Sequence, residues 1–324
     1  MLRSMAATGD AERRIGAREV RGGIFRALAL PTYPRFFASG VCWNIARWLS
    51  LFTASYLVYH QSGSTLLVQL VGTAYFAPLF VGGLAAGVIA DRFDRLRVLR
   101  LQFWLLAAAS LGIGFVAIAG RSQPWQIYLA MALMGLGGVA DLTFRRALIG
   151  DLTGVRLLAN AMALEAISMT GGSLLGNLLG GAIVDLAGSG EAFCGCGILC
   201  ATAALCLVGV RVPPRSREIP AYGSLIAQLG EGVRYAARHR ALLGVLGVTV
   251  VMNVFFYTYL PLVPLFAGRL GVNAFWTGVL GSAAGCGSLA GACLIAAVDR
   301  PPWRVRFYAG GVGVALAGLV VFAL

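Results

Sequence analysis

The chain has 324 residues, of which 59% are hydrophobic and only 12% are charged, and its mean hydropathy is +0.81. These values exclude an ordinary soluble globular protein, in which charged residues make up about a quarter of the chain. The net charge of +13 would suit a nucleic-acid-binding protein, but the arginines lie in short segments between long apolar runs. Arginines in such segments orient a chain in a membrane and contact anionic lipid, so we expect lipid contacts and no nucleic-acid partner.

Nine apolar runs, each close to the roughly 20 residues that a bilayer core requires, predict an all-α, multi-pass membrane protein. All 26 basic residues are arginine, and 23 of them fall into alternate segments between the runs, starting with the first. By the positive-inside rule, these segments are cytosolic, which predicts a bacterial inner-membrane protein with a cytosolic N-terminus. The predicted spans are 36–59, 66–90, 98–119, 125–149, 157–185, 192–210, 241–266, 275–298 and 305–324.

The first run carries two polar residues at the depth of the bilayer centre. Residues 1–35 before it contain arginines throughout and no apolar stretch, so we expect them to lie in the cytosol and the first span to direct insertion. Arg47 lies about twelve residues into this span, with Asn44 three positions earlier on the same helix face. A charge at this depth is costly and by default indicates a functional site.

The loop between the second and third spans reads GVIADRFDRLRVL, residues 87–99. Gly87 follows Gly83 by four residues, a spacing that lets two helices approach closely. Asp91 stands at a helix C-terminus, where the helix dipole disfavours an anion, so we expect compensation from Arg92, Arg95 or the N-terminus of another helix. The alternative is an ordinary arginine-rich cytosolic loop.

Three further ionisable residues follow in the fourth and fifth spans. Asp141 and Arg145 are one helical turn apart near the cytosolic end, and Glu165 lies about eight residues into the fifth span. Burial disfavours the charged form of a carboxylate, which is the property that a proton-coupling site needs. A purely structural pairing of Arg47 with Glu165 or with backbone groups is an equal alternative.

The fifth span continues with GNLLGG, which contains Gly176, Asn177, Gly180 and Gly181, and Gly172, Gly176 and Gly180 form a small-residue packing ridge. Four cysteines cluster in the sixth span, but the chain has only two histidines and both are remote in sequence. We therefore expect the cysteines to pack between helices, with no metal and no other cofactor. No Gly-x4-Gly-Lys phosphate loop is present, which excludes an ATP-driven motor in this chain.

Residues 211–240 contain Pro213-Pro214 and then apolar residues at helical spacing, which predicts a linker with an amphipathic helix on the membrane surface. In the seventh span, Asn253 and Tyr257 share one helix face and either line a cavity or are satisfied within the bundle. The predicted parts are therefore a cytosolic segment (1–35), a six-helix bundle (36–210), the linker (211–240) and an incomplete second bundle (241–324).

An internal repeat relates the two bundles. A shift of 208 residues places Asp91 on Asp299 and Arg92 on Arg300, at equivalent places in the predicted helices. Duplicated halves are common among transporters. The first copy has six spans, so we expect twelve in the whole fold, of which nine are present in these 324 residues.

Gly87, Asp91, Arg92 and Arg95 match the Gly-x3-Asp-Arg-x-Gly-Arg signature of the major facilitator superfamily, with Asp94 in place of the last glycine. The chain most resembles the bacterial branch that contains the enterobactin exporter and macrolide efflux proteins. The segments that carry this likeness are 34–40, 143–154, 157–168 and 231–240. GNLLGG resembles the family's Gly-Pro-x-x-Gly-Gly antiporter motif, with Asn177 at the proline position.

The resemblance implies two bundles that open alternately to either side of the membrane, with proton-driven export and a gating network of Asp91, Arg95, Asp141 and Arg145. We thus predict a secondary transporter, not an enzyme, which exports a drug-like or siderophore-like small molecule by proton antiport. Two alternatives stay open. One is a non-transporting remnant of a truncated transporter, and the other is a membrane enzyme with Asp91 and Asp94 as metal ligands.

Overall fold

The computed structural model describes residues 25–92, 94–212 and 257–297, with isolated positions between 234 and 248 and between 310 and 320. Every regular element in these residues is helical, as predicted, because a helix satisfies its own backbone hydrogen bonds in a lipid environment. The elements are η1 (Arg26–Ala29), α2 (Tyr33–Ser62), α3 (Thr65–Arg92), α4 (Arg95–Ile118), α5 (Pro124–Ala140), the π-helical turn η2 (Asp141–Arg145), α6 (Arg146–Leu186), α7 (Ser189–Cys206), the 3-10 turn η4 (Tyr257–Leu262), α10 (Val263–Arg269) and α11 (Ala274–Ala297).

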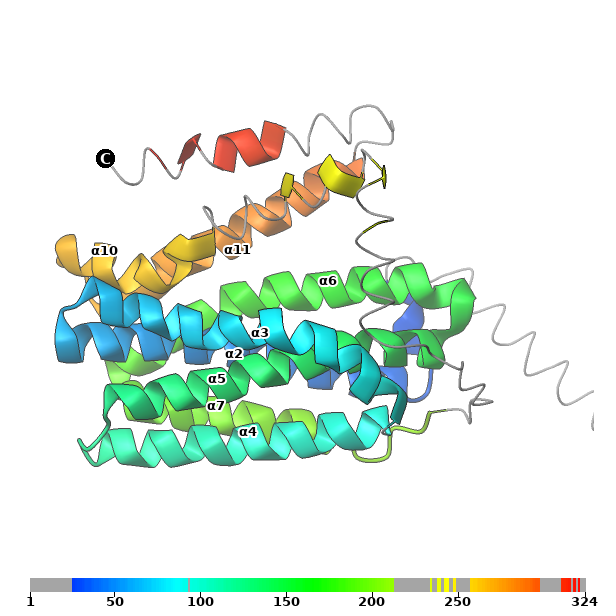
Figure 1. Cartoon of the computed structure of the whole chain (residues 1–324), viewed down its shortest axis with the longest axis horizontal. Helices are drawn as coiled ribbons and strands as arrows, with labels where there is room; N and C mark the ends of the chain where they lie inside the picture. The colour runs from blue at the N-terminus through cyan, green and yellow to red at the C-terminus, as the bar shows by residue number, and fades with distance from the viewer. Residues whose placement is uncertain are drawn as a thin grey trace, which may run out of the picture.

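Helices α2 to α7 form one bundle with α2 at its centre (Figure 1). Helix α2 packs against α6 and α7, while α4 packs against α7 and α3 against α5. The buried rings of Trp43 and Phe103, whose centroids are 5.5 Å apart, join α2 to α4. Most arginines of this bundle lie where α3 meets α4 and near the start of α6, which we call the arginine-rich end; they are Arg92, Arg95, Arg97, Arg100, Arg145, Arg146 and Arg156.

The ends of the helices follow from local sequence. The Asp94 carboxylate caps α4 by accepting hydrogen bonds from the backbone N–H groups of Leu96 and Arg97, at 3.0 and 3.2 Å. Gly63 ends α2 in the left-handed conformation, with φ of 60°. Gly154, with φ of 62° and ψ of 179°, interrupts the long element α6. Such a left-handed backbone suits glycine, and it makes the turn between the fourth and fifth predicted spans.

Three stretches in the described residues are long and apolar enough to cross a membrane: Arg95–Ile118, Pro124–Leu186 and Ser189–Cys206. The second of them has 63 residues and contains two predicted spans, on either side of Gly154. The last predicted span (305–324) and the predicted linker (211–240) lie mostly outside the described residues.

The seventh predicted span, 241–266, is not a uniform α-helix at its end. From Tyr257 the chain forms η4, which contains Pro261, and then the short helix α10, which extends to Arg269. Proline lacks the backbone N–H that the interior of an α-helix uses, which favours the 3-10 turn here, although α3 continues through Pro78. Residues 257–266 of this predicted span are therefore a 3-10 turn followed by a short helix, and the residues before Tyr257 lie mostly outside the described ones.

Helix α11 packs on α6 over half of its length only (Figure 1). The residue pairs in contact are Gly181 with Gly278, Asn177 with Gly281 and Leu174 with Gly285. Beyond Gly285, residues 286–290 are exposed on every side of the helix, although the first half of α11 carries buried residues. The two helices therefore converge at the end opposite to the arginine-rich end and separate towards the arginine-rich end.

Candidate functional site

A buried ion pair lies inside the bundle at the π-helical turn. Arg145 Nε donates to Asp141 Oδ1 at 2.7 Å, and only 1% and 6% of the two side chains are exposed. Arg145 Nη1 also donates to the carbonyl of Phe36 at 3.3 Å, and its guanidinium lies over the Phe36 and Phe103 rings, 5.0 and 5.8 Å from their centroids. A π-helical turn carries one extra residue and so re-aims its side chains, and such turns often occur at functional sites.

Glu165 on α6 is close to this pair. It is 93% buried, and a Cβ atom placed on Gly40 of α2 would lie 3.5 Å from Glu165 Oε2 and 3.0 Å from Arg145 Nη1. A larger residue at this position would press on the Arg145 guanidinium, whereas the Glu165 carboxylate lies at ordinary contact distance. Arg145, Asp141 and Arg47 are the charges that act on Glu165 most strongly.

These side chains border a small cavity of about 10 Å³, room for about one water, which we call the charged cavity. Asn44 lines this cavity, and its Nδ2 donates a hydrogen bond to Ser168 Oγ at 3.1 Å. Arg145 Nη2 and Asn44 Oδ1 are buried without a hydrogen-bond partner among the described residues. The polar and charged lining residues are Asn44, Arg47, Asp141, Arg145, Arg146 and Glu165.

The charged cavity joins two groups that the sequence analysis kept apart. Asp141 and Arg145 were predicted in a gate at the cytosolic surface, and Glu165, Arg47 and Asn44 in a coupling site. The structure places all five around one cavity. The sequence missed two features of this site, which are the π-helical turn at 141–145 and the close approach at Gly40. Neither has a signal in hydropathy or helical spacing.

Only part of the predicted gating network lies within the described residues. Arg95 Nη1 forms an ion pair with Asp151 Oδ2 of α6 at 3.0 Å, whereas Asp141 and Arg145 pair with each other. Gly87, Asp91 and Arg92 lie in the last turns of α3, but their side chains lie outside the described residues, and so does that of Tyr257 at the start of η4. Asn253 also lies outside them.

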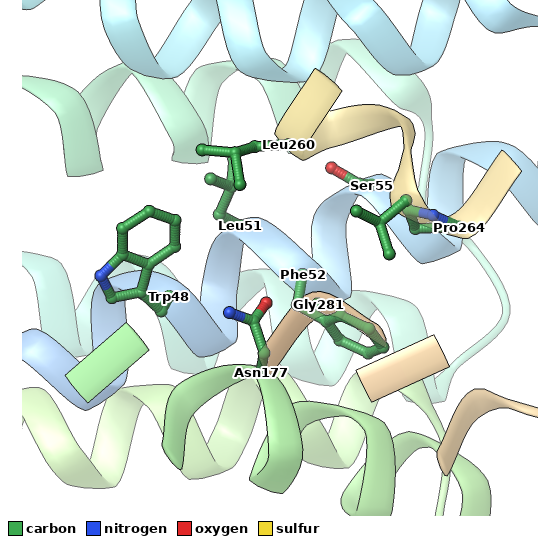
Figure 2. Close-up of a pocket in the computed structure, with 9 residues that line it drawn as sticks. Trp48, Leu51, Phe52, Ser55, Asn177, Leu260, Pro264 and Gly281 are labelled. Carbon is green, nitrogen blue, oxygen red and sulfur yellow. The ribbon is translucent and has the colours of Figure 1, made fainter. Parts of the chain in front are cut away.

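A second small cavity of about 10 Å³, room for about one water, lies where α2, α6, α10 and α11 meet (Figure 2). We call it the aromatic pocket because the indole of Trp48 and the ring of Phe52 line it from α2. Its polar groups are the Ser55 hydroxyl and the carboxamide of Asn177 on α6. Ser55 Oγ is buried and has no hydrogen-bond partner among the described residues. The remaining lining residues are Leu51, Leu260, Val263, Pro264 and Gly281.

The predicted small-residue ridge on α6 faces α2. Gly176 lies against the Ile45 carbonyl and Trp48 Cβ of α2, since an added Cβ would be 2.7 Å from each. Gly181, beside the ridge, faces α11, because a Cβ on it would lie 2.6 Å from the Ala274 carbonyl oxygen and 2.8 Å from Gly278 Cα. The small residues of α6 therefore allow close contact with α2 on one side and with α11 on the other.

Asn177, which stands at the proline position of the antiporter motif, leaves the helix regular. Gly154 is the residue of α6 with non-helical φ and ψ, far from the motif. Asn177 Nδ2 donates to the Ser173 carbonyl at 2.8 Å, one turn earlier in the same helix. Asparagine keeps the backbone N–H that proline lacks, so no interruption follows from it.

The cysteines of α7 lie in helix packing. Cys196 Sγ donates to the Ala46 carbonyl of α2 at 3.4 Å and lies 3.6 Å from Ser110 Oγ of α4. Within the part of the chain that the structure describes, no three His, Cys, Asp or Glu residues are grouped as metal ligands would be.

Comparisons with known proteins agree with this architecture. The enterobactin exporter EntS of Salmonella choleraesuis is 31% identical over 214 residues, which cover 61% of this chain and 49% of that protein. Mouse protein spinster homolog 3 is 26% identical over 181 residues, 47% of this chain and 35% of that protein. The chain thus spans about half or less of the length of these curated relatives.

Among solved structures, a D-xylose-proton symporter superimposes with a TM-score of 0.59 at 16% identity, covering 81% of this chain and 66% of that one. This likeness shows the fold. The family model described as Major Facilitator Superfamily matches residues 36–324. Since that match takes in all of the helices from α2 to α11, together with both cavities, the chain is a multi-pass membrane protein that belongs to the Major Facilitator Superfamily.

Proposed function

We propose that this chain is a secondary transporter that exports a small amphipathic molecule in exchange for protons, with Glu165 as the proton-binding group. The observation that supports this proposal is the charged cavity. In it, the buried carboxylate of Glu165 lies near Arg145, which already forms an ion pair with a second carboxylate, Asp141. A buried carboxylate that is only partly compensated is poised to bind a proton. The enterobactin exporters among the relatives support the outward direction.

The separation of α6 from α11 supports a route for the exported molecule. The helices part towards the arginine-rich end, which the arginine distribution predicts to be cytosolic. At the opposite end, Asn273 Nδ2 donates to Asp185 Oδ2 at 3.2 Å, and the Tyr59 hydroxyl packs directly against Gly268. A solute would therefore enter from the cytosol, and these outer contacts would separate to release it.

The loop after α3 is proposed to gate the cytosolic side. Arg95 already ties the start of α4 to α6 through Asp151. Gly87, Asp91 and Arg92 precede it at the end of α3. We propose that this segment, together with the Arg95–Asp151 pair, holds the cytosolic ends of the first bundle in place while the second half moves.

The proton-coupling role can be tested in proteoliposomes that contain the 324-residue chain. Saturable solute accumulation driven by a pH gradient is expected, and Glu165→Gln should abolish it while solute exchange without a gradient continues. The matched control is Glu191→Gln at the exposed start of α7, which should leave both fluxes unchanged. Gradient-driven accumulation that survives Glu165→Gln would assign the coupling to another group.

The same assay addresses the alternative of a non-transporting remnant. A folded chain that binds solute but supports no saturable flux would favour the remnant. The enzyme alternative is dropped, because the family and the named relatives are transporters. Asp94, one of the two metal ligands that this alternative required, is engaged as the cap of α4 and pairs with Arg97 at 3.3 Å.

A further inference from the structure

Two polar atoms of the charged cavity's lining side chains have no hydrogen-bond partner among the described residues. They are Arg145 Nη2 and Asn44 Oδ1, and both residues are 99% buried. Arg145 uses Nε for Asp141 and Nη1 for the carbonyl of Phe36. Asn44 uses Nδ2 for Ser168. Buried polar groups in proteins are nearly always hydrogen-bonded, so these two atoms indicate a bound ligand.

The chemistry of the two atoms and the size of the cavity restrict this ligand to water. Arg145 Nη2 can only donate a hydrogen bond and Asn44 Oδ1 can only accept one, so the ligand must accept and donate at once. A metal cation cannot accept, and a halide ion cannot donate. The charged cavity has room for about one water. A buried water makes about three hydrogen bonds, and the Glu165 carboxylate, which lines the same cavity, offers the third.

We propose that the charged cavity binds one water molecule and that Glu165 exchanges its proton through this water. The water would accept a hydrogen bond from Arg145 Nη2 and donate hydrogen bonds to Asn44 Oδ1 and to the ionised Glu165 carboxylate. The proposal rests on the transport function above and deepens it, because it names the proton donor of Glu165 and makes Asn44 a positioning residue.

The cavity has a more accessible side through which protons would reach this water. Asn44, Asp141, Arg145 and Glu165 are buried, but the other lining residues are not. Those residues are Arg47, Leu142 and Met169, which are half-buried, and Arg146, which is exposed. The bound water therefore lies between the buried carboxylate of Glu165 and the accessible side.

The proton step needs no reactant other than solvent water. A hydronium ion on the accessible side passes a proton to the bound water, and the bound water passes one of its own protons along its hydrogen bond to Glu165. The hydronium ion becomes water, the bound water keeps its composition, and the carboxylate becomes a carboxylic acid. The protonated Glu165 then donates a hydrogen bond to the bound water instead of accepting one. The hydrogen bonds of the water therefore change whenever Glu165 takes up a proton.

Other groups also act on Glu165, and their charges do not depend on the water. They are Tyr33 and Arg47 of α2, Asp141 and Arg145 of η2, and Arg146 of α6, which lines the same cavity. In α11, which packs on α6, cysteines are the only ionisable residues. A test of the water must therefore observe the water itself.

The site is tested by a crystal structure of the 324-residue chain at a resolution that shows ordered water. We expect one density peak within about 2.7–3.2 Å of both Arg145 Nη2 and Asn44 Oδ1. Asn44→Leu keeps a side chain of similar size but removes the acceptor, so the peak should disappear. Ser168→Ala is the matched variant, because it removes the other partner of Asn44 and leaves Oδ1 in place, so the peak should remain. The water site is refuted if the unmodified chain shows no peak, or if both atoms bond to protein groups instead.

The role of the water is tested by infrared difference spectra of the chain in proteoliposomes, recorded between high and low pH. Protonation of Glu165 should give a carboxylic C=O band that Glu165→Gln removes. We expect an O–H stretching band in the same spectrum that moves to lower frequency in water labelled with the heavy oxygen isotope. Glu165→Gln should remove this water band, and Asn44→Leu should remove it while the C=O band persists. Both bands should persist in Ser168→Ala and in Glu191→Gln, at the exposed start of α7.

A water that only fills space would not respond to Glu165 and would give no such band. A C=O band of Glu165 without an isotope-sensitive water band would therefore refute the role of the water. The density peak and the water band of the unmodified chain decide the case even where Asn44→Leu folds poorly. Gradient-driven accumulation that survives Glu165→Gln would refute the transport coupling alone, since neither the peak nor the band depends on flux.

Discussion

Removal of one partner from the buried pair at the π-helical turn is expected to be strongly destabilising. Arg145 is 99% buried, its Nη2 already lacks a hydrogen-bond partner among the described residues, and its shortest contact is the 2.7 Å bond to Asp141. Asp141→Asn would leave the guanidinium with the Phe36 carbonyl, two ring faces and the nearby Glu165.

The size of the effect follows from this environment. Breaking a buried ion pair by removing one partner costs about 3–5 kcal/mol, because the other charge stays buried without compensation. Glu165 compensates in part, so we expect about 3 kcal/mol for Asp141→Asn, measured as the loss in free energy of unfolding. Asp141→Asn combined with Arg145→Gln should recover part of this loss, because no buried charge is then left unpaired by the change.

The assay is reversible unfolding of the purified chain by SDS titration in mixed micelles, followed by circular dichroism. Arg97→Gln is the control, since the Arg97 side chain is 84% exposed and its pair with Asp94 is worth about 0.2–1 kcal/mol at most. A loss below about 1 kcal/mol for Asp141→Asn would refute the reasoning, and so would a double variant less stable than either single variant.

Two other predictions concern topology and the contact between the halves. Reporter fusions after Arg100, Arg156 and Arg217 should report the cytosol, and fusions after Gly63, Arg121 and Gly190 the exterior, because of the arginine distribution; reversal at two of these sites would overturn the membrane path. Gly181→Leu should force α6 away from Gly278, since even a Cβ would lie 2.8 Å from Gly278 Cα. The yield of crosslinking between cysteines placed at the exposed positions Asp185 and Asn273 should then fall. The control is Gly171→Leu, at a glycine with no atom near its Cβ position, which should leave the crosslinking yield unchanged.

The helices were predictable because a bilayer requires long apolar segments. Span length and apolar content act locally along the chain, so the predicted span 98–119 lies close to α4, Arg95–Ile118. The family was predictable as well, because the GVIADRFDR segment carries a recognisable signature, and the family match confirms it. The hydropathy profile gave no sign of the 3-10 turn at 257–262, which contains Pro261.

The site was predictable only as a set of candidates. Helical spacing places Asn44 and Arg47 on one face, but it does not indicate which face of another helix lies opposite. The association of Glu165 with Asp141 and Arg145 depends on a π-helical turn and on the missing side chain of Gly40. The aromatic pocket depends on where α10 and α11 meet α2, a distance between segments more than two hundred residues apart. Such long-range geometry leaves no periodic trace in the sequence.

The contact between α6 and α11 has a kinetic consequence. It brings backbone against backbone at Gly181 and Gly278, with no side chain of one helix inserted between side chains of the other at that point. Interlocked side chains must change rotamer before two helices can turn past each other, because protein interiors are closely packed. A glycine contact lacks this barrier, and α11 can roll on α6 through small rotations without repacking at this point. In the proposed transport cycle, we therefore expect the rate at which the two halves exchange orientation to depend on the polar contacts at the ends of the helices, such as the one between Asn273 and Asp185.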